Sequence, residues 1–348
     1  MRKVGIGLAG TGRMGRVHLN NLVQRCAVAE LACVYDADPD RAAAVAAEYG
    51  VPAARTFAEL VERSEAVAVA TSTGSHAELT VAAAQAGKPV LCEKPLSLDR
   101  ATTVSTIEAV EAAGVALQVG FHRRYDPDWM AAAARIHAGD LGEVTYFRTS
   151  LRDMTPPDPN FLSGSGGFFA DVTVHDLDVA RWLVGDVVEV TAHGAASDPA
   201  FAELGDIDTA VCVLRFANGA LGVIDNSRSA RYGYECSTEV VGTKASVRVE
   251  APRPLEWRTP GQASYPLARD FEERYPAAYA AELDAFARCV LDGTAPRVTG
   301  RDALAAFDLA AAATESWRTG TTSFLPTSTD GDGRINGSAS MAGQKGRP

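Results

Sequence analysis

The sequence predicts two folds in succession: a doubly wound parallel α/β sheet, then an α+β domain built on a large, mostly antiparallel open sheet. Up to about residue 121, short β-branched runs alternate with alanine-rich helical stretches, which is typical of a parallel sheet covered by helices. From about Leu141, apolar and polar residues alternate between turns such as Asn218-Gly219, which is typical of antiparallel strands. We therefore expect domains at residues 1–121 and 122–325 and a tail at 326–348.

The chain begins with a predicted strand, glycine turn and helix. Apolar Val4 to Ala9 leads directly into a glycine-rich turn, and an amphipathic stretch continues to Gln24. Glycine is needed where such a turn is tight, where backbone approaches a pyrophosphate, and where helix packs on strand. The phosphates would lie at the positive N-terminus of the helix. This pattern predicts a Rossmann-type dinucleotide site, and its cofactor-binding residues in the turn are Gly10, Gly12, Arg13, Met14 and Gly15.

Asp36 ends the second predicted strand, Ala29 to Tyr35, about twenty residues after the glycine turn. At that place a carboxylate accepts hydrogen bonds from an adenosine ribose and repels the 2′-phosphate of NADP. Uncharged Ala37 follows it, so the sequence predicts NAD as the cofactor. Arg13 is the side chain that could instead reach a phosphate.

Further strands and helices complete the predicted parallel sheet. The strands are expected at 66–70, 89–92 and 115–119, and the helices at 38–50, 76–86 and 99–113. Open α/β sheets bind ligands at the carboxyl ends of their strands. We therefore expect Glu93 and Lys94, after one strand, and residues 121–126, after another, to face the cofactor.

The second domain is predicted from its alternating strands. A helix around Asp171 to Leu183 should cover the inner face of their sheet, and alanine-rich helices at 277–291 and 302–319 should close the fold. Residues 326–348 are rich in Gly, Ser, Thr and Asp and are expected to be disordered. The strands are expected at 144–151, 187–192, 210–216, 220–226, 237–241 and 245–249.

Lys94, Asp171 and His175 are the most informative polar residues. In a helix, a spacing of four puts Asp171 and His175 on one face, which suits a base and its orienting carboxylate. Lys94 could stabilise negative charge on a hydroxyl as its proton leaves, so proton abstraction from an alcohol fits best. Each residue alone also fits an ordinary helix pair or a solvated lysine. With Asp171 beside it, His175 should have a pKa above about 6.5, and oxidation should be fastest at alkaline pH.

The composition excludes several partners. A formal net charge of −11 and a pI near 5.1 would repel a polyanion, so no nucleic acid is expected. No stretch has membrane-spanning length, so no membrane is expected either. The six cysteines lack disulfide or zinc spacing, which predicts a reducing compartment, the cytoplasm, and no bound metal.

Together these motifs resemble the Gfo/Idh/MocA oxidoreductase family. The resemblance covers about residues 3–325 and rests on the glycine turn, Glu93-Lys94-Pro95 and the Asp171/His175 pair, which follow the family's order. Three further segments resemble the inositol dehydrogenases of this family, namely residues 120–126, Arg152-Asp153 and residues 232–234.

One segment, residues 71–76, departs from the family, whose members often carry a proline before the histidine. The loop near the nicotinamide is therefore expected to differ in shape. By resemblance Thr71, Ser72 and His76 should contact the cofactor, although His76 could simply cap a helix.

The resemblance implies that Lys94, Asp171 and His175 form the catalytic set of an NAD-dependent dehydrogenase. His175 would take the hydroxyl proton as hydride leaves for nicotinamide C4, Asp171 would hold the imidazole, and Lys94 would steady the alkoxide. The implied reaction is oxidation of a cyclic polyol, myo-inositol to 2-keto-myo-inositol, by a homotetramer or homodimer. The implied substrate-binding residues are Lys94, Arg124, Asp153, Asp171, His175 and Tyr234.

Several alternatives stay open at this point. The substrate could be another inositol isomer or an aldose, and Arg124, Asp153 and Tyr234 could each be structural. An NAD-dependent glycosidase would share the fold but form no net NADH. A nucleotide-binding sensor would have no need of the three polar residues, and a metal cluster would make activity sensitive to chelators. That cluster would consist of Asp171, His175, Asp176 and Asp178.

Overall fold

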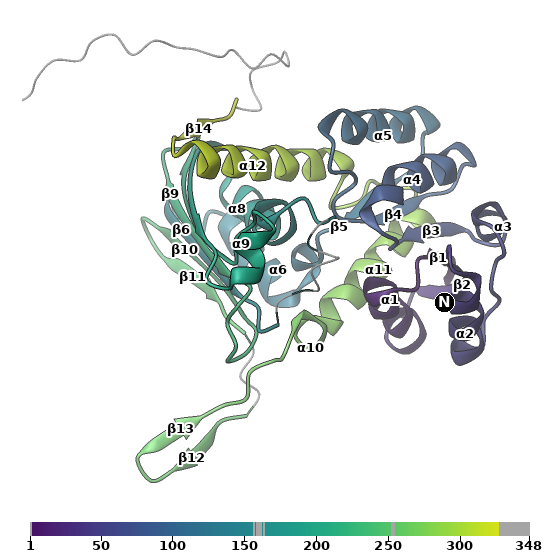
Figure 1. Ribbon diagram of the computed structural model, residues 1–348, viewed down its shortest axis with the longest axis horizontal. Helices are drawn as coiled ribbons and strands as arrows, with labels where there is room; N and C mark the ends of the chain where they lie inside the picture. The colour runs from purple at the N-terminus through teal and green to yellow at the C-terminus, as the bar shows by residue number, and fades with distance from the viewer. Residues whose placement is uncertain (1, 156, 158–161, 163, 252–254, 327–348) are drawn as a thin grey trace, which may run out of the picture.

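A five-stranded parallel sheet forms the N-terminal half of the computed structural model (Figure 1). The model describes residues 2–155, 157, 162, 164–251 and 255–326. The strand order is β2-β1-β3-β4-β5, so the order reverses beside β1, where doubly wound sheets bind ligands. The strands are β1 (Val4–Ala9), β2 (Ala29–Tyr35), β3 (Ala66–Val69), β4 (Val90–Glu93) and β5 (Leu117–Gly120), and the helices are α1 (Arg13–Gln24), α2 (Pro39–Tyr49), α3 (Phe57–Glu62), α4 (His76–Gln85) and α5 (Arg100–Ala113).

The helix ends follow from local sequence. Asp38 caps α2 by accepting the N–H groups of Asp40 and Arg41, and Gly50 ends the helix in the left-handed region. Asp99 caps α5 by accepting the N–H group of Thr102, and Gly114 ends that helix in the left-handed region. Helix α3 was not predicted because its six residues are too short to show a helical period.

A seven-stranded sheet forms the second half, in the order β11-β10-β6-β9-β8-β7-β14. Every neighbouring pair is antiparallel except β6 and β9, which confirms the predicted mostly antiparallel open sheet. The strands are β6 (Val144–Arg152), β7 (Val187–Ala195), β8 (Thr209–Phe216), β9 (Leu221–Ser227), β10 (Glu235–Gly242), β11 (Ser246–Val249) and β14 (Ser323–Phe324).

Helices cover one face of this sheet and leave the other open. Along β8, buried and exposed residues alternate at every position, so one set of side chains enters the core. The covering helices include α8 (Val174–Val184), as predicted, which follows a π-helical turn, η3 (Phe169–Thr173). The remaining elements are the 3₁₀ turns η1 (Thr73–Ser75) and η2 (His122–Tyr125), the helices α6 (Pro127–His137), α9 (Pro199–Glu203) and α10 (Phe271–Arg274), and the strands β12 (Trp257–Thr259) and β13 (Gln262–Ser264) of a hairpin that projects from the body (Figure 1).

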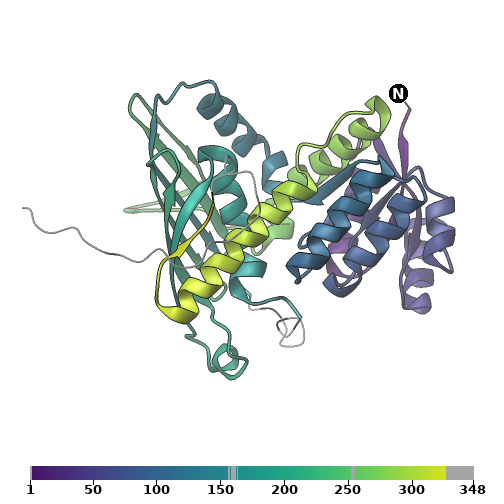
Figure 2. The same cartoon turned by 90° about the horizontal axis from the view of Figure 1, so that it is seen from above.

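Two long helices join the halves, as the view from above shows (Figure 2). Helix α11 (Pro276–Asp292) returns to the N-terminal half, where Leu283 and Phe286 share a core with Val4 and Ile6. The predicted boundary at residue 121 therefore does not separate the packing of the two halves. Helix α12 (Gly300–Thr319) runs from α5 to the large sheet.

Two of the predictions concern membrane spans and the C-terminal tail. No helix within the described ranges is long and apolar enough to cross a membrane. Residues 327–348 of the predicted disordered tail lie outside the described residues.

Candidate active site

The glycine turn has room for a pyrophosphate at the start of α1. A Cβ at Gly10, whose φ is +92°, would lie 2.4 Å from the carbonyl oxygen of Ala70, and one at Gly15 would lie 2.1 Å from that of Gly10. Packing therefore requires these two glycines. At Gly12, by contrast, a Cβ would meet nothing within 4 Å, and no side chain caps the helix. The free N–H groups at this end suit the phosphates of NAD.

Asp36 lies next to this turn, as predicted. Its carboxylate accepts hydrogen bonds from the backbone N–H of Thr11 (2.8 Å) and the Thr11 hydroxyl (2.7 Å). Burial would raise the pKa of Asp36, but hydrogen bonds from Asp38 and Thr11 and the charge of Arg41 outweigh it and lower that pKa. Arg41 lies 3.6 Å away and is a basic neighbour that the sequence argument missed.

Arg13 contacts two residues of α10 and stays exposed. Its Nε lies 2.7 Å from the Glu272 carboxylate, and its guanidinium stacks 4.5 Å from the centre of the Phe271 ring. Met14, its neighbour, packs against both hydrophobic cores. Arg41, beside Asp36, is thus a second basic residue that could reach a 2′-phosphate.

His76 is a correction to the prediction. It is 2% exposed, and its ring nitrogens lie 2.8 Å from the Pro95 carbonyl oxygen and 3.1 Å from that of Thr71. Burial opposes charge on the ring, but Cys92 and these two carbonyl groups raise the pKa of His76 to about 9. His76 thus joins the loop after β3 to the loop after β4, while Thr71 and Ser72 stay accessible for a cofactor.

Glu93 also differs from the prediction. Its carboxylate lies 2.7 Å from Nε2 of His18, and the residue is only 7% exposed. A Cβ on Gly120 of the neighbouring strand would lie 2.8 Å from this carboxylate. Glu93 is therefore enclosed between α1 and the sheet.

Lys94 and Asp171 are brought together from segments 77 residues apart. The Lys94 ammonium donates to the Asp171 carbonyl oxygen at 2.8 Å and to the carboxylate Oδ1 at 3.1 Å. An ammonium has three N–H groups, so these bonds leave one for a ligand. Both side chains are mostly buried, at 14% and 18% exposed, which strengthens their attraction.

Asp171 does not hold His175 in the way the spacing predicted. It lies in the π-helical turn before α8, where the side-chain spacing of a regular helix does not apply. Its Oδ2 is 3.3 Å from the Arg228 guanidinium, and Nδ1 of His175 has no hydrogen-bond partner among the described residues. The expected carboxylate–imidazole pair is thus replaced by a carboxylate between two cations.

The surroundings of His175 reverse the predicted shift of its pKa. The ring packs 5.4 Å from the ring of His122, and the side chain stays partly exposed. Burial, followed by the charges of Lys94, His122 and Arg123, holds the pKa of His175 well below 6.5. The predicted rise in the pKa of His175 is therefore not found, because Asp171 pairs with Lys94 and Arg228 instead of with the imidazole.

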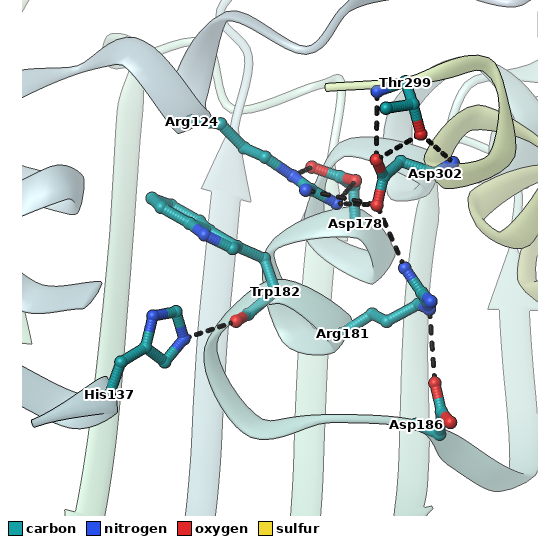
Figure 3. Close-up of polar contacts among 8 residues, drawn as sticks. All are labelled: Arg124, His137, Asp178, Arg181, Trp182, Asp186, Thr299 and Asp302. Carbon is teal, nitrogen blue, oxygen red and sulfur yellow. Dashed lines mark hydrogen bonds and ion pairs between the residues drawn. The ribbon is translucent and has the colours of Figure 1, made fainter. Parts of the chain in front are cut away.

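Arg124 is a structural residue rather than a ligand for substrate (Figure 3). Its guanidinium donates to both carboxylate oxygens of Asp178, at 2.9 and 2.5 Å, and lies 3.3 Å from Asp302. Asp302 also accepts from Arg181 at 3.2 Å. These ion pairs occupy the Arg124 guanidinium, which joins η2, α8 and α12 and is therefore not proposed to bind a polyol.

Asp153 and Tyr234 are the two other predicted substrate contacts. Asp153 follows β6, and its backbone N–H donates to the Ser227 carbonyl oxygen at 2.8 Å. Burial raises the pKa of Asp153 even though its backbone partners and the charges of Arg13 and Arg228 oppose the rise. Tyr234 is 4% exposed and its ring packs 6.2 Å from the ring of Tyr275.

Comparison with known proteins identifies the chain's relatives. Residues 4–121 match the model of an oxidoreductase family with an NAD-binding Rossmann fold, and residues 129–248 match the model of the GFO/IDH/MocA C-terminal domain. The chain belongs to the Gfo/Idh/MocA oxidoreductase family. As predicted, it is an NAD-dependent oxidoreductase whose N-terminal half is the cofactor domain.

Within the family, the chain is similar to inositol dehydrogenases. It is 36% identical to the scyllo-inositol 2-dehydrogenase (NAD(+)) of Bacillus subtilis, with 89% of this chain and 93% of that protein covered. It is 39% identical to the myo-inositol 2-dehydrogenase of Thermotoga maritima, with 89% and 95% covered. The crystal structure of a myo-inositol dehydrogenase from Corynebacterium glutamicum superposes with a TM-score of 0.88 at 33% identity, covering 94% of this chain and 100% of that one.

Two buried residues of this Gfo/Idh/MocA chain were missed from the sequence. The His122 ring stacks on Tyr279 of α11, with 4.7 Å between ring centres, and also packs edge-on against the His175 ring. Arg228 follows β9, where the inward positions Gly222, Ile224 and Asn226 recur every second residue. Continuing that period would have placed Arg228 inside.

The acidic residues of α8 do not gather into a metal site. Asp176 is 2.6 Å from the Arg123 guanidinium and also accepts from Thr149 and Asn226. Asp178 is taken up by Arg124. Within the described ranges, no group of three or more His, Cys, Asp or Glu could hold a metal ion.

Proposed function

We propose that the chain oxidises a cyclic polyol with NAD, converting myo-inositol to 2-keto-myo-inositol. The observation that carries this proposal is the buried Lys94–Asp171 pair beside His175, where the carboxyl end of β4 meets the helix of the second sheet. Such a site can bind a hydroxyl, accept its proton and stabilise the alkoxide. Bound NAD would supply the hydride acceptor.

His175 is the proposed general base. A lowered pKa keeps its imidazole neutral at physiological pH, which is the form that accepts a proton. Lys94 would use its remaining N–H on the oxygen that loses the proton, and Asp171 would hold Lys94 in place. Asp171 thus keeps a proposed catalytic role, but by orienting the lysine rather than the imidazole.

Asp153 and Tyr234 remain proposed substrate contacts, while Arg124 no longer is. A polyol ring offers several hydroxyls, and a carboxyl and a phenol can each bind one. Support comes from the position of Asp153 at the end of β6, within electrostatic range of Arg228, which contacts Asp171.

A second candidate substrate is scyllo-inositol, because one relative is a scyllo-inositol 2-dehydrogenase. The test is to incubate purified protein with NAD and a panel of cyclitols and sugars and to measure the absorbance of NADH. Highest kcat/KM with myo-inositol would support the first proposal, and highest kcat/KM with scyllo-inositol would replace it. No net NADH with any polyol, together with cleavage of a glycoside, would indicate an NAD-dependent glycosidase.

We further propose a homotetramer or homodimer located in the cytoplasm. Support for assembly comes from Val211, Val213 and Leu221, which are 41–47% exposed on the open side of the large sheet. The six free cysteines agree with a reducing compartment.

A further inference from the structure

Arg228 is a buried cation beside the proposed catalytic pair. It follows β9 on the inward side and is 1% exposed, although a guanidinium is always charged at physiological pH. Burying such a charge is costly unless it is paired and hydrogen-bonded. The partners of Arg228 therefore indicate why it is there.

These partners include two carboxylates and two aromatic rings. One terminal nitrogen of the guanidinium donates to Oδ2 of Asp171 at 3.3 Å, and the other lies 4.0 Å from Oδ2 of Asp206. The guanidinium also lies 4.9 Å from the centre of the Phe168 ring and 5.7 Å from that of Phe201.

The second carboxylate is itself fixed. Oδ1 of Asp206 accepts the backbone N–H of Phe168 at 3.1 Å, so Arg228, Asp206 and the segment before η3 are joined. The two rings and Asp206 leave the guanidinium few orientations.

Asp171 consequently lies between two cations. Its Oδ1 accepts from Lys94 at 3.1 Å, and its Oδ2 accepts from Arg228. A carboxylate held at one oxygen can still rotate, whereas one held at both keeps its plane. The charges of Lys94, Arg228, Asp171 and Asp206 also balance, so the set can be buried without net charge.

We infer that Arg228 is a positioning residue for the oxidation proposed above, acting through Asp171 on the Lys94 ammonium. It does not touch the reacting carbon, because its guanidinium is covered. The inference rests on the proposed function. In it, Arg228 keeps the Lys94 ammonium oriented during turnover. Misplacement of a catalytic group by about 1 Å can cost about 100-fold in rate.

The test is a double-mutant cycle with Arg228→Gln, Asp171→Ala and both together. Arg228→Gln should lower kcat by about 10- to 100-fold, with KM changed less and NAD affinity unchanged. In the Asp171→Ala background the same substitution should cost less than about threefold, because the residue through which Arg228 acts is gone. Equal losses in both backgrounds would overturn the inference.

Two further variants keep the test valid if Arg228→Gln folds poorly. Arg228→Lys keeps a positive charge and should recover part of kcat, although a lysine cannot contact both carboxylates at once. Arg231→Gln removes a guanidinium three residues away whose side chain is 74% exposed, and it should leave kcat unchanged. A kcat near the wild-type value in Arg228→Lys and Arg228→Gln would contradict a positioning role.

A measurement without substrate separates this inference from the proposed function. Acetylation of Lys94 by a lysine-directed reagent, followed by mass spectrometry, reports whether Lys94 is held. Lys88, whose ammonium donates to the Ser64 carbonyl oxygen, serves as the internal reference. The ratio of Lys94 to Lys88 modification should rise severalfold in Arg228→Gln, and an unchanged ratio would overturn the inference even if no polyol is oxidised by the wild type.

Discussion

At the scale of single residues, the chemistry depends on how charge is distributed around Asp171 and His175. Asp171 pairs with Lys94 and Arg228 rather than with His175, and burial, followed by the charges of Lys94, His122 and Arg123, lowers the pKa of His175 so that the ring stays neutral. The sequence selected Lys94, Asp171 and His175 through their motifs together and the family resemblance, and the structure brings Lys94 and Asp171 into contact. The sequence could not predict which groups pair with Asp171, because Arg228 lies 57 residues further along the chain, after β9.

The pH dependence follows from this charge distribution. A base whose pKa is lowered is already deprotonated at neutral pH and is lost only as the pH falls through that lowered value. We expect kcat/KM for polyol oxidation to change little from about pH 6.5 to 8.5 and to fall at acidic pH. A pH profile of kcat/KM checks this expectation. It would be contradicted if kcat/KM of the wild type rose with a midpoint above about pH 6.5 and this rise were absent from His175→Gln.

Cofactor choice is a second property of single residues. Asp36→Ser should raise the kcat/KM for NADP relative to NAD by about tenfold or more, a change of about 1.4 kcal/mol, because it removes the repelling carboxylate. Arg41, 3.6 Å from Asp36, would then be free to contact the 2′-phosphate. Steady-state kinetics with both cofactors is the measurement. Adding Arg41→Gln should cancel the gain, and an unchanged ratio in Asp36→Ser would show that Asp36 does not discriminate.

At the scale of elements, the site is built from loops at strand ends. Strands β1 and β2 match their predicted ends because apolar runs are bounded by a glycine turn and by Asp36. The π-helical turn before α8 was not predicted, because no residue pattern distinguishes it from a regular helix. The carbonyl oxygen of Asp171 in this turn accepts a hydrogen bond from Lys94, a contact that the local sequence does not show. The helical spacing predicted that Asp171 would pair with His175, whereas Asp171 pairs with Lys94 and Arg228.

The glycine turn offers a test with a matched control. Gly12→Val should weaken NAD binding about tenfold or more without loss of stability, because a Cβ there meets no protein atom. Gly15→Ala should instead lower the thermal unfolding temperature, since its Cβ would lie 2.1 Å from a backbone oxygen. NAD titration and thermal unfolding measure the two effects. Normal NAD affinity in Gly12→Val would refute this placement of the pyrophosphate.

At the scale of the whole molecule, two helices join a nucleotide domain to an open sheet. The sequence predicted both halves, because their hydrophobic periods differ, and it predicted the helices α11 and α12. It could not predict that α11 completes the N-terminal core, since an amphipathic helix pattern fits any apolar surface of suitable shape.

The open side of the large sheet makes a prediction about assembly. Wild-type protein should elute as a dimer or tetramer, and Val211→Lys with Val213→Lys should shift it toward monomer, because charged side chains on an apolar interface lose their hydration. Val23→Lys, at a 51% exposed position on α1, serves as the control. Light scattering after size exclusion gives the mass, and a wild-type monomer would contradict the proposed assembly.

The most direct test of the central claim is NADH formation by wild type and Lys94→Ala with NAD and myo-inositol. Wild type should form NADH, and Lys94→Ala should lower kcat by about 100-fold or more while NAD affinity and folding persist, because a preorganised donor to the alkoxide is lost. NAD affinity is measured separately by titration. Near-native turnover in Lys94→Ala, or NAD binding lost in step with turnover, would contradict the claim that the Lys94–Asp171 pair performs the chemistry.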